Sequence, residues 1–332
     1  KIIKVEADVG YVHRGVELAC TTKFKFKQVG YVVARVCGLC AIVHSTCYTL
    51  ACEELLGLEA PRRASYLRII ANELDRIHSH LLCLAHTAEN AGFEALFMRT
   101  MKDRELIMEA QETLTGNRVQ FDYVCIGGVN KDVTTDIERV VKEKLTLLKQ
   151  KVAEIEELFL NNWSLSLKYK GVGTITTESA LRCSVLGPLA RASGVDFDVR
   201  NESDYLPYKE LGFKSVIEGS GDVHARNMVR LREVFESIRL IEAALDGLPE
   251  GEIASKVKGA PDGESYMRVE APRGECFYYL KGSKGQYLDR VRIKTPTFGS
   301  VPAMVEALTG QNYADAPAII ASFDPCLSCT AR

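Results

Sequence analysis

The chain has 332 residues, of which 46% are hydrophobic and 26% charged, as in a soluble globular protein with a sizeable core rather than a disordered tail or a fibre. Its 42 lysine and arginine residues balance 44 aspartate and glutamate residues to a net charge of −2, so bulk electrostatics do not indicate nucleic-acid binding. Residues 36–52 form a charge-free stretch that is too short and too polar to span a bilayer. We therefore expect any membrane to be reached through a partner.

Eleven cysteines are an odd number, and the chain is much longer than the small disulfide frameworks of secreted domains. We therefore expect a reducing compartment. The chain begins at Lys1 and no signal-peptide pattern follows, so we expect a processed or trimmed start and leave a missing N-terminal segment open.

The first elements follow from local patterns. Residues 1–12 are rich in β-branched side chains and predict a strand that leads into a turn at residues 11–15. An apolar run after His44 predicts a helix that ends at Gly57, and Pro61 suits the first turn of the next helix. That next helix has the clearest periodicity, with apolar residues every three or four positions, and should lie in the core. These residues are Leu67, Ile70, Leu74, Ile77, Leu81, Leu84 and Ala88.

Further helices are predicted along the middle of the chain. Residues 93–114 suit an antiparallel successor, and residues 133–159 predict a long amphipathic helix with alternating charge on its polar face. Two glycine-punctuated stretches, 171–177 and 187–194, are predicted to be loops around a short helix. Helical spacing returns at residues 223–245.

Toward the C-terminus, alternation in residues 267–270 and 276–280 predicts a β-hairpin, with residues 282–285 between its strands. No repeat or linker divides the chain. We predict a mainly α protein with a helical bundle core and small peripheral β-sheets (α+β), forming a single domain over residues 1–332.

Two Cys-x-x-Cys pairs lie near opposite ends of the chain, Cys37 with Cys40 and Cys326 with Cys329. If the fold brings them together, four thiolates form a soft-metal site suited to zinc, iron or nickel. Zinc ribbons usually place the second pair about 15 to 20 residues after the first, so this spacing argues against a ribbon. A structural zinc site remains open on the two pairs alone.

The residues around both pairs, 35–44 and 324–329, resemble the two signature motifs of nickel-iron hydrogenase large subunits. The resemblance covers nearly the whole chain and implies the fold of those subunits. Similar segments are residues 11–17, 76–82, 187–194, 196–200 and 270–274. The stretches at 187–194 and 196–200 look most like the membrane-bound, energy-converting branch, which is related to the quinone-side catalytic subunit of respiratory complex I. That relative has lost the cysteines.

The resemblance implies a nickel-iron centre, Ni(Cys)4-Fe(CN)2(CO), and heterolytic cleavage or formation of H2. Cys37 and Cys326 would be terminal thiolates on nickel. Cys40 and Cys329 would bridge nickel to an iron that carries carbonyl and cyanide ligands. By the same resemblance, Cys326 is the base that takes the proton. Soft thiolate sulfur suits such a metal, and a metal-bound thiol is deprotonated.

Other residues are expected to orient this centre. His44 matches the family histidine that donates a hydrogen bond to a bridging thiolate; outside the motif, a lone histidine is more often a satisfied core residue. Arg273 matches the arginine over the metal pair, where it would contact an iron cyanide. Asp324 is expected to hold that guanidinium bidentately, and Thr297 is a weaker candidate for a cyanide hydrogen bond.

The remaining seven cysteines lack partners at ligand spacing and are expected to be buried free thiols. They are Cys20, Cys47, Cys52, Cys83, Cys125, Cys183 and Cys276. Without a cysteine set for an iron-sulfur cluster, electrons should leave through an iron-sulfur small subunit. Residues 171–173 and 281–285 match no dinucleotide or phosphate loop, so no nucleotide site is expected. The branch implies membrane-embedded ion-translocating subunits and a peripheral position on the cytoplasmic face of a membrane.

The chain departs from the family pattern in two places. An early Gly-Pro-x-His-Pro-like segment is absent, so the residue that first accepts the proton from Cys326 is not identified. Many soluble hydrogenases end with a histidine that forms a separate metal site with the glutamate matching Glu17, but Arg332 stands here. Arginine has no free lone pair, so we expect no magnesium at Glu17 and predict that Arg332 pairs with it. An end at Arg332 also fits removal of a C-terminal extension after nickel insertion.

Three alternatives remain open. The chain could be the large subunit of a soluble cofactor-linked nickel-iron hydrogenase, a metal-free quinone-site or scaffold subunit like the complex I relative, or a structural zinc protein. Retention of all four cysteines argues against the metal-free alternative.

Overall fold

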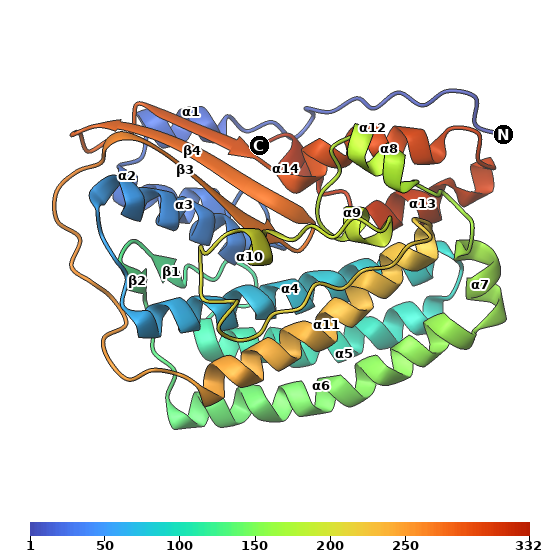
Figure 1. The fold of residues 1–332 in the computed structure, drawn as a ribbon, viewed down its shortest axis with the longest axis horizontal. Coiled ribbons are helices and arrows are strands. Elements are labelled where there is room, and N and C mark those ends of the chain that lie inside the picture. Colours follow the sequence, from blue (N-terminus) through green and yellow to red (C-terminus); the bar gives the residue numbers. More distant parts are fainter.

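A computed structural model describes residues 1–332 (Figure 1). The first half contains α1 (Val16–Thr22), α2 (Phe26–Ala34), α3 (Ala41–Leu56), α4 (Arg62–Asn90), α5 (Glu94–Thr115), β1 (Val124–Cys125), β2 (Gly128–Val129) and α6 (Thr135–Asn161). The second half contains α7 (Trp163–Tyr169), α8 (Thr177–Arg182), α9 (Pro188–Ala192), α10 (Val199–Glu202), α11 (Val223–Asp246), β3 (Asp262–Ala271), β4 (Gly274–Ser283), β5 (Arg290–Lys294), α12 (Pro296–Leu308), η1 (Tyr313–Asp315), α13 (Ala316–Phe323) and α14 (Leu327–Thr330).

Four long helices form the bundle in the lower part of Figure 1. Helix α4 packs against α5 and α11, and α6 packs against the same two helices. The apolar row that predicted α4, from Leu67 to Ala88, is fully buried. The predicted helices in residues 93–114, 133–159 and 223–245 correspond to α5, α6 and α11. The prediction of a mainly α protein with small peripheral sheets is confirmed.

The larger sheet is antiparallel, has the order β3-β4-β5 and packs against α3. Ala271 pairs with Gly274, so Pro272 and Arg273 form the turn between β3 and β4. The predicted hairpin is therefore present, but its turn is not at residues 282–285: Gly282 and Ser283 are the last paired residues of β4, opposite Gly263 and Asp262 of β3. Gly187 and Gly274 both have positive φ, and a Cβ at Gly187 would lie 2.3 Å from the Gly274 Cα. This close approach fixes the Arg273 turn against the start of α9 and explains where the chain reverses.

The predicted strand in residues 1–12 is wrong. Residues 1–15 contain no helix or strand, and most of them are exposed. The Ile2 N–H donates to the Gln311 carbonyl at 2.8 Å, and the Gly310 N–H donates to the Ile2 carbonyl at 2.9 Å. A β-branched pattern forms a strand only where a neighbouring strand completes its hydrogen bonds, and the sequence alone could not reveal that none lies alongside.

Two further local predictions need correction. Residues 187–194 are not simply a loop, because Pro188 opens the short helix α9 with a fixed φ suited to that position. Pro61 precedes α4 as its N-cap rather than lying in its first turn. Across the chain, no helix combines the length and the apolarity that crossing a bilayer requires.

Candidate metal centre

The first cysteine pair lies in the connection between α2 and α3. Cys37 is fully buried in this loop, and its Sγ accepts a hydrogen bond from the Leu39 N–H at 3.3 Å. Cys40 is the N-cap residue of α3 and is 1% exposed. The partial positive charge at a helix N-terminus favours the thiolate form of a cysteine placed there.

The second pair lies at the start and within α14, after the end of α13. The N–H of Cys326 donates to Thr297 Oγ1 at 3.2 Å, and the carbonyl of Cys329 accepts from Thr295 Oγ1 at 2.9 Å. Thr297 thus anchors the main chain at Cys326, and its expected contact with a cyanide remains a prediction. Cys326 is partly exposed, whereas Cys329 is buried.

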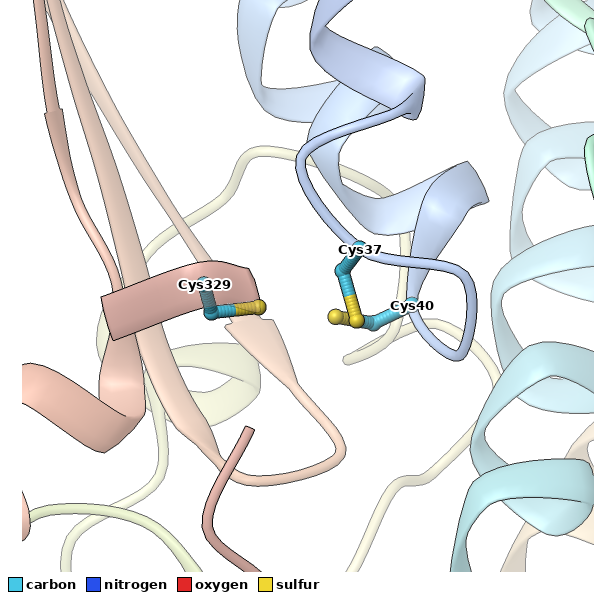
Figure 2. Close-up of side chains that lie close together, drawn as sticks. All are labelled: Cys37, Cys40 and Cys329. Atoms are coloured by element: carbon cyan, nitrogen blue, oxygen red, sulfur yellow. The ribbon is translucent and has the colours of Figure 1, made fainter. Parts of the chain in front are cut away.

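The fold brings the two pairs together. The Sγ atoms of Cys37, Cys40 and Cys329 all lie within 4.8 Å of one another, with Cys329 facing the other two from α14 (Figure 2). Cys326 Sγ lies 3.5 Å from Cys37 Sγ. None of these cysteines is in a disulfide. Four free sulfurs from opposite ends of the chain are therefore gathered at one point.

Two residues outside the cysteine pairs join the loops. One Arg14 guanidinium nitrogen donates to the carbonyls of Val36 and Ser328, at 3.3 Å and 2.9 Å. The Ser328 hydroxyl also donates to the Val36 carbonyl, at 2.7 Å. Sequence reasoning assigned no role to these two residues. Arg14 lies in the segment 11–17, which resembles a family segment, and this resemblance was the available indication that Arg14 has a role.

His44 lies beside a cysteine of the second pair, and its expected role as a hydrogen-bond donor to that sulfur remains a prediction. Its Nε2 is 3.8 Å from Cys329 Sγ, and its Nδ1 is 2.8 Å from the Tyr278 hydroxyl. The imidazole is fully buried. Tyr278, on β4, was not singled out from the sequence.

Arg273 projects from the β3–β4 turn and is 5% exposed. Its Nε donates to the Asp324 carbonyl at 2.8 Å, and its Nη2 donates to Asp324 Oδ1 at 2.9 Å. Asp324 therefore holds the guanidinium at two points, and one of the two acceptors is its main-chain carbonyl rather than its carboxylate; Asp324 itself has a left-handed backbone conformation. Arg273 Nη1 and Asp324 Oδ2 are buried without a hydrogen-bond partner.

The sulfurs influence one another's protonation. Hydrogen bonds from the Cys329 and Cys37 thiols lower the pKa of Cys40 to about 7 despite its burial, and Arg273 acts in the same direction. A hydrogen bond from Cys326 likewise lowers the pKa of Cys37. At Cys326 a hydrogen bond from Cys329 lowers the pKa, but donation to Cys37 together with burial raises it overall. The pKa of Cys329 is raised because this thiol donates to the other three cysteines and is buried.

A cavity of about 680 Å³ lies between α4 and α13. Leu39, Arg273, Asp324, His86 and Tyr313 are among the residues that line it, and none of the four cysteines does. Tyr313 is 82% exposed, so the cavity extends to the surface. Small molecules can reach Arg273 by this route.

Glu17 and Arg332 form the predicted ion pair, with Arg332 Nε 3.2 Å from Glu17 Oε1. The same oxygen accepts from the Ile293 N–H at 2.9 Å, and Oε2 accepts from Arg292 at 3.1 Å. The side chains of Glu17 and Arg332 are 21% and 19% exposed, so the pair is not fully buried. Its contribution to stability is therefore smaller than that of a buried pair.

The other seven cysteines are free, as expected. Cys20, Cys47, Cys52, Cys83 and Cys276 are buried. Cys125 and Cys183 are partly exposed, so the expectation of burial is wrong for these two.

Comparisons with known proteins agree with the sequence motifs. Residues 14–89 match the family model described as nickel-dependent hydrogenase. Residues 90–259 and 254–332 match the model described as respiratory-chain NADH dehydrogenase, 49 Kd subunit.

Three relatives each match almost the whole chain at 36% identity. The membrane-bound hydrogenase subunit alpha of Pyrococcus furiosus aligns with 100% of this chain over 82% of its own length. The carbon monoxide-induced hydrogenase of Rhodospirillum rubrum aligns with 100% of this chain over 92% of its own length. A subunit of the F(420)H(2) dehydrogenase of Methanosarcina mazei aligns with 98% of this chain over 90% of its own length.

Proposed function

Because the chain belongs to the protein family that unites nickel-dependent hydrogenase large subunits with the 49 kDa subunit of respiratory NADH dehydrogenases, we propose that it is the catalytic large subunit of an energy-converting hydrogenase. The reaction is heterolytic cleavage or formation of H2 at a nickel-iron centre. The observation that supports this most strongly is the convergence of four free cysteine sulfurs from opposite ends of the chain.

The residues present fit such a centre. Four thiolates are the soft donors that nickel prefers. The unpartnered Arg273 Nη1 is a buried donor whose hydrogen-bonding capacity remains to be filled. Cys37 and Cys326 would hold nickel, and Cys40 and Cys329 would bridge it to an iron with two cyanides and one carbonyl.

When bound, the centre supplies polarisation of H2 and storage of its two electrons. Cys326 takes and returns a proton at Sγ, because it is the one partly exposed sulfur of the four. Arg273 is a fixed cation that stabilises negative charge developing beside it, and Asp324 restrains its guanidinium. His44 directs Nε2 at Cys329 and thereby orients that sulfur.

The electrons require a partner. The chain offers no second cysteine set for an iron-sulfur cluster, so we assign their transfer to an iron-sulfur small subunit. Its proposed binding surface is the apolar surface beside the cysteine loops, where Tyr11 is 91% exposed, Leu18 68% and Leu327 65%. Relatives are named as a membrane-bound hydrogenase and a formate hydrogenlyase, which supports partners embedded in a membrane. We place the complex on the cytoplasmic face of that membrane.

The proposal is tested by elemental analysis and infrared spectroscopy of the protein purified with its partners. We expect about one nickel and one iron per chain, with infrared bands of carbonyl and cyanide ligands. Stoichiometric zinc without nickel identifies a structural zinc protein. Absence of any metal in a functional complex identifies a quinone-site or scaffold subunit. Copurification of membrane subunits separates the proposal from a soluble cofactor-linked hydrogenase.

A further inference from the structure

We propose that Tyr278 is a positioning residue of the sulfur site, which donates a hydrogen bond to His44 Nδ1 and so fixes the tautomer whose Nε2–H points at Cys329. This inference rests on the proposed function for its effect on catalysis. The tautomer itself is a property of the protein chain.

The geometry joins three residues in a row. The Tyr278 hydroxyl is 2.8 Å from His44 Nδ1, and His44 Nε2 is 3.8 Å from Cys329 Sγ, within reach for a contact to sulfur. Both Tyr278 and His44 are fully buried. Burial opposes protonation of His44, but the neighbouring Cys276, Cys37 and Cys326 raise its pKa overall, so the tautomer is defined at a pH above that value. There the neutral imidazole carries a hydrogen on only one nitrogen, and a donor at Nδ1 leaves that hydrogen on Nε2.

The direction of the Tyr278 hydrogen bond follows from its surroundings. Burial raises the pKa of Tyr278 well above its usual value, so the hydroxyl keeps its hydrogen. Cys276 Sγ is also near His44 Nδ1, at 3.6 Å, but a thiol is a weaker donor than a phenol. Tyr278 is therefore the group that occupies the Nδ1 lone pair. The edge-on arrangement of the two rings, 70° apart, also restricts rotation of the imidazole.

Removal of the Tyr278 hydroxyl should release this constraint. In Tyr278→Phe the imidazole can place its hydrogen on Nδ1, toward Cys276, and then presents a lone pair rather than a donor to Cys329. A thiolate that loses a donor becomes more electron-rich. In the assembled hydrogenase, the carbonyl and cyanide bands should then move to lower wavenumber, and H2 turnover should fall by about 10-fold to 100-fold, as for other residues that orient metal ligands.

The matched control is Tyr48→Phe. Tyr48 is also fully buried in the same core cluster, and its hydroxyl donates to the Phe26 carbonyl at 2.6 Å rather than to His44. Both variants lose one buried tyrosine hydrogen bond. General destabilisation should therefore affect both, whereas loss of the tautomer should affect only Tyr278→Phe. Cys276→Ala should leave the tautomer unchanged.

The direct measurement is nitrogen NMR of the full chain with 15N-labelled histidine, in which His44→Gln assigns one of the six histidines. We expect His44 as the Nε2–H tautomer in the wild type, in Tyr48→Phe and in Cys276→Ala, and a gain of Nδ1–H in Tyr278→Phe. A doubly protonated or Nδ1–H ring in the wild type overturns the proposal, even if Tyr278→Phe fails to fold. An unchanged tautomer in folded Tyr278→Phe overturns it as well.

The infrared measurement separates this inference from the proposed function. A wild-type complex without carbonyl and cyanide bands defeats the nickel-iron proposal but leaves the NMR result valid. Wild-type bands that Tyr278→Phe does not shift defeat the role assigned to Tyr278 alone.

Discussion

Two of the regions in which the protein buries polar groups are organised in opposite ways. One is an ionic network at the junction of α4, α9, α10, α11 and β3, whose side-chain nitrogen and oxygen atoms all have hydrogen-bond partners. It consists of Glu73, Arg76, Arg191, Asp198, Arg200, Glu233 and Glu270. The other is the sulfur site, where Arg273 Nη1 and Asp324 Oδ2 have none. The network is complete without a ligand, and the sulfur site is not.

The ionic network supports the sulfur site through the main chain. Arg76 forms an ion pair with Glu73 at 3.1 Å and donates to the Glu270 and Ala271 carbonyls, at 2.7 Å and 3.2 Å. Those carbonyls lie directly before the turn that carries Arg273. The ionic network, whose hydrogen bonds are complete, therefore fixes the turn that carries Arg273, whose guanidinium still lacks a hydrogen-bond partner at Nη1. The difference shows that buried charge can be fully paired in one place and left with unpartnered atoms in another.

The largest expected effect comes from removing a sulfur. We predict that Cys326→Ser loses nickel and abolishes H2 turnover, because an alcohol is a poor ligand for a soft metal. Cys183→Ser, which changes a partly exposed cysteine outside the group, should retain both. Metal analysis and H2 assays of the two purified complexes test this. Full nickel content in Cys326→Ser would show that this residue is not needed to bind the metal.

A substitution in the ionic network should lower the stability of the folded protein. Glu73→Gln is expected to lower the free energy of unfolding by about 3 to 5 kcal/mol, because Arg76 then lacks its buried counter-charge and Arg200 loses one of its buried carboxylate partners. Urea unfolding is the measurement. Glu109→Gln, in an exposed pair with Lys144, should change stability little. Equal losses in the two variants would contradict the distinction between buried and exposed charge.

Low pH should reduce the contribution of the ionic network to the free energy of unfolding. Although burial opposes ionisation, Arg76 and Arg200 lower the pKa of Glu73, so the folded state binds this proton less readily than the unfolded state. Its contribution to stability is present above the unfolded pKa of about 4.3 and is lost as the pH falls through the folded value. Unfolding curves from pH 6 downward should show a shallower decline in Glu73→Gln than in the wild type. A parallel decline would exclude Glu73 as the source.

Arg273→Lys should have a smaller effect, confined to the reaction. An ammonium keeps the charge but not the planar fork that donates twice to Asp324, so we expect normal metal content and turnover about 10-fold to 100-fold lower. Arg292→Lys, at a side chain 58% exposed, provides the control. Wild-type turnover in Arg273→Lys would remove Arg273 from the proposed mechanism.

The smallest effect is expected at Glu17. Because this ion pair is partly exposed, Glu17→Gln should lower the free energy of unfolding by no more than about 1 kcal/mol, below the value for a buried pair. Urea unfolding again measures the change, with Glu73→Gln for comparison. A loss as large as that in Glu73→Gln would mean that Glu17 acts as part of a buried site.

Helices with long apolar rows were predictable from sequence because their own periodicity encodes the buried face, as in the row from Leu67 to Ala88 in α4. The conformation of residues 1–12 was not predictable in this way, because a strand needs a neighbouring strand, and the sequence does not reveal whether one lies alongside. The two cysteine pairs could be found by motif, and the structure places His44, Arg273 and Asp324 near them, while their roles remain predictions. Tyr278 could not be found, because its contact with His44 spans 234 positions and depends on the register of β4.

The closure of the sulfur site by α14 sets an order of events during biosynthesis. Cys37 and Cys326 are 289 positions apart, so the second cysteine pair is made long after the first. Until then the loop before α3 offers two thiols, where the folded protein gathers four. Arg14 and Ser328 can join the two loops only after α14 has been made, so the joining of these loops and the gathering of the four sulfurs are the same event.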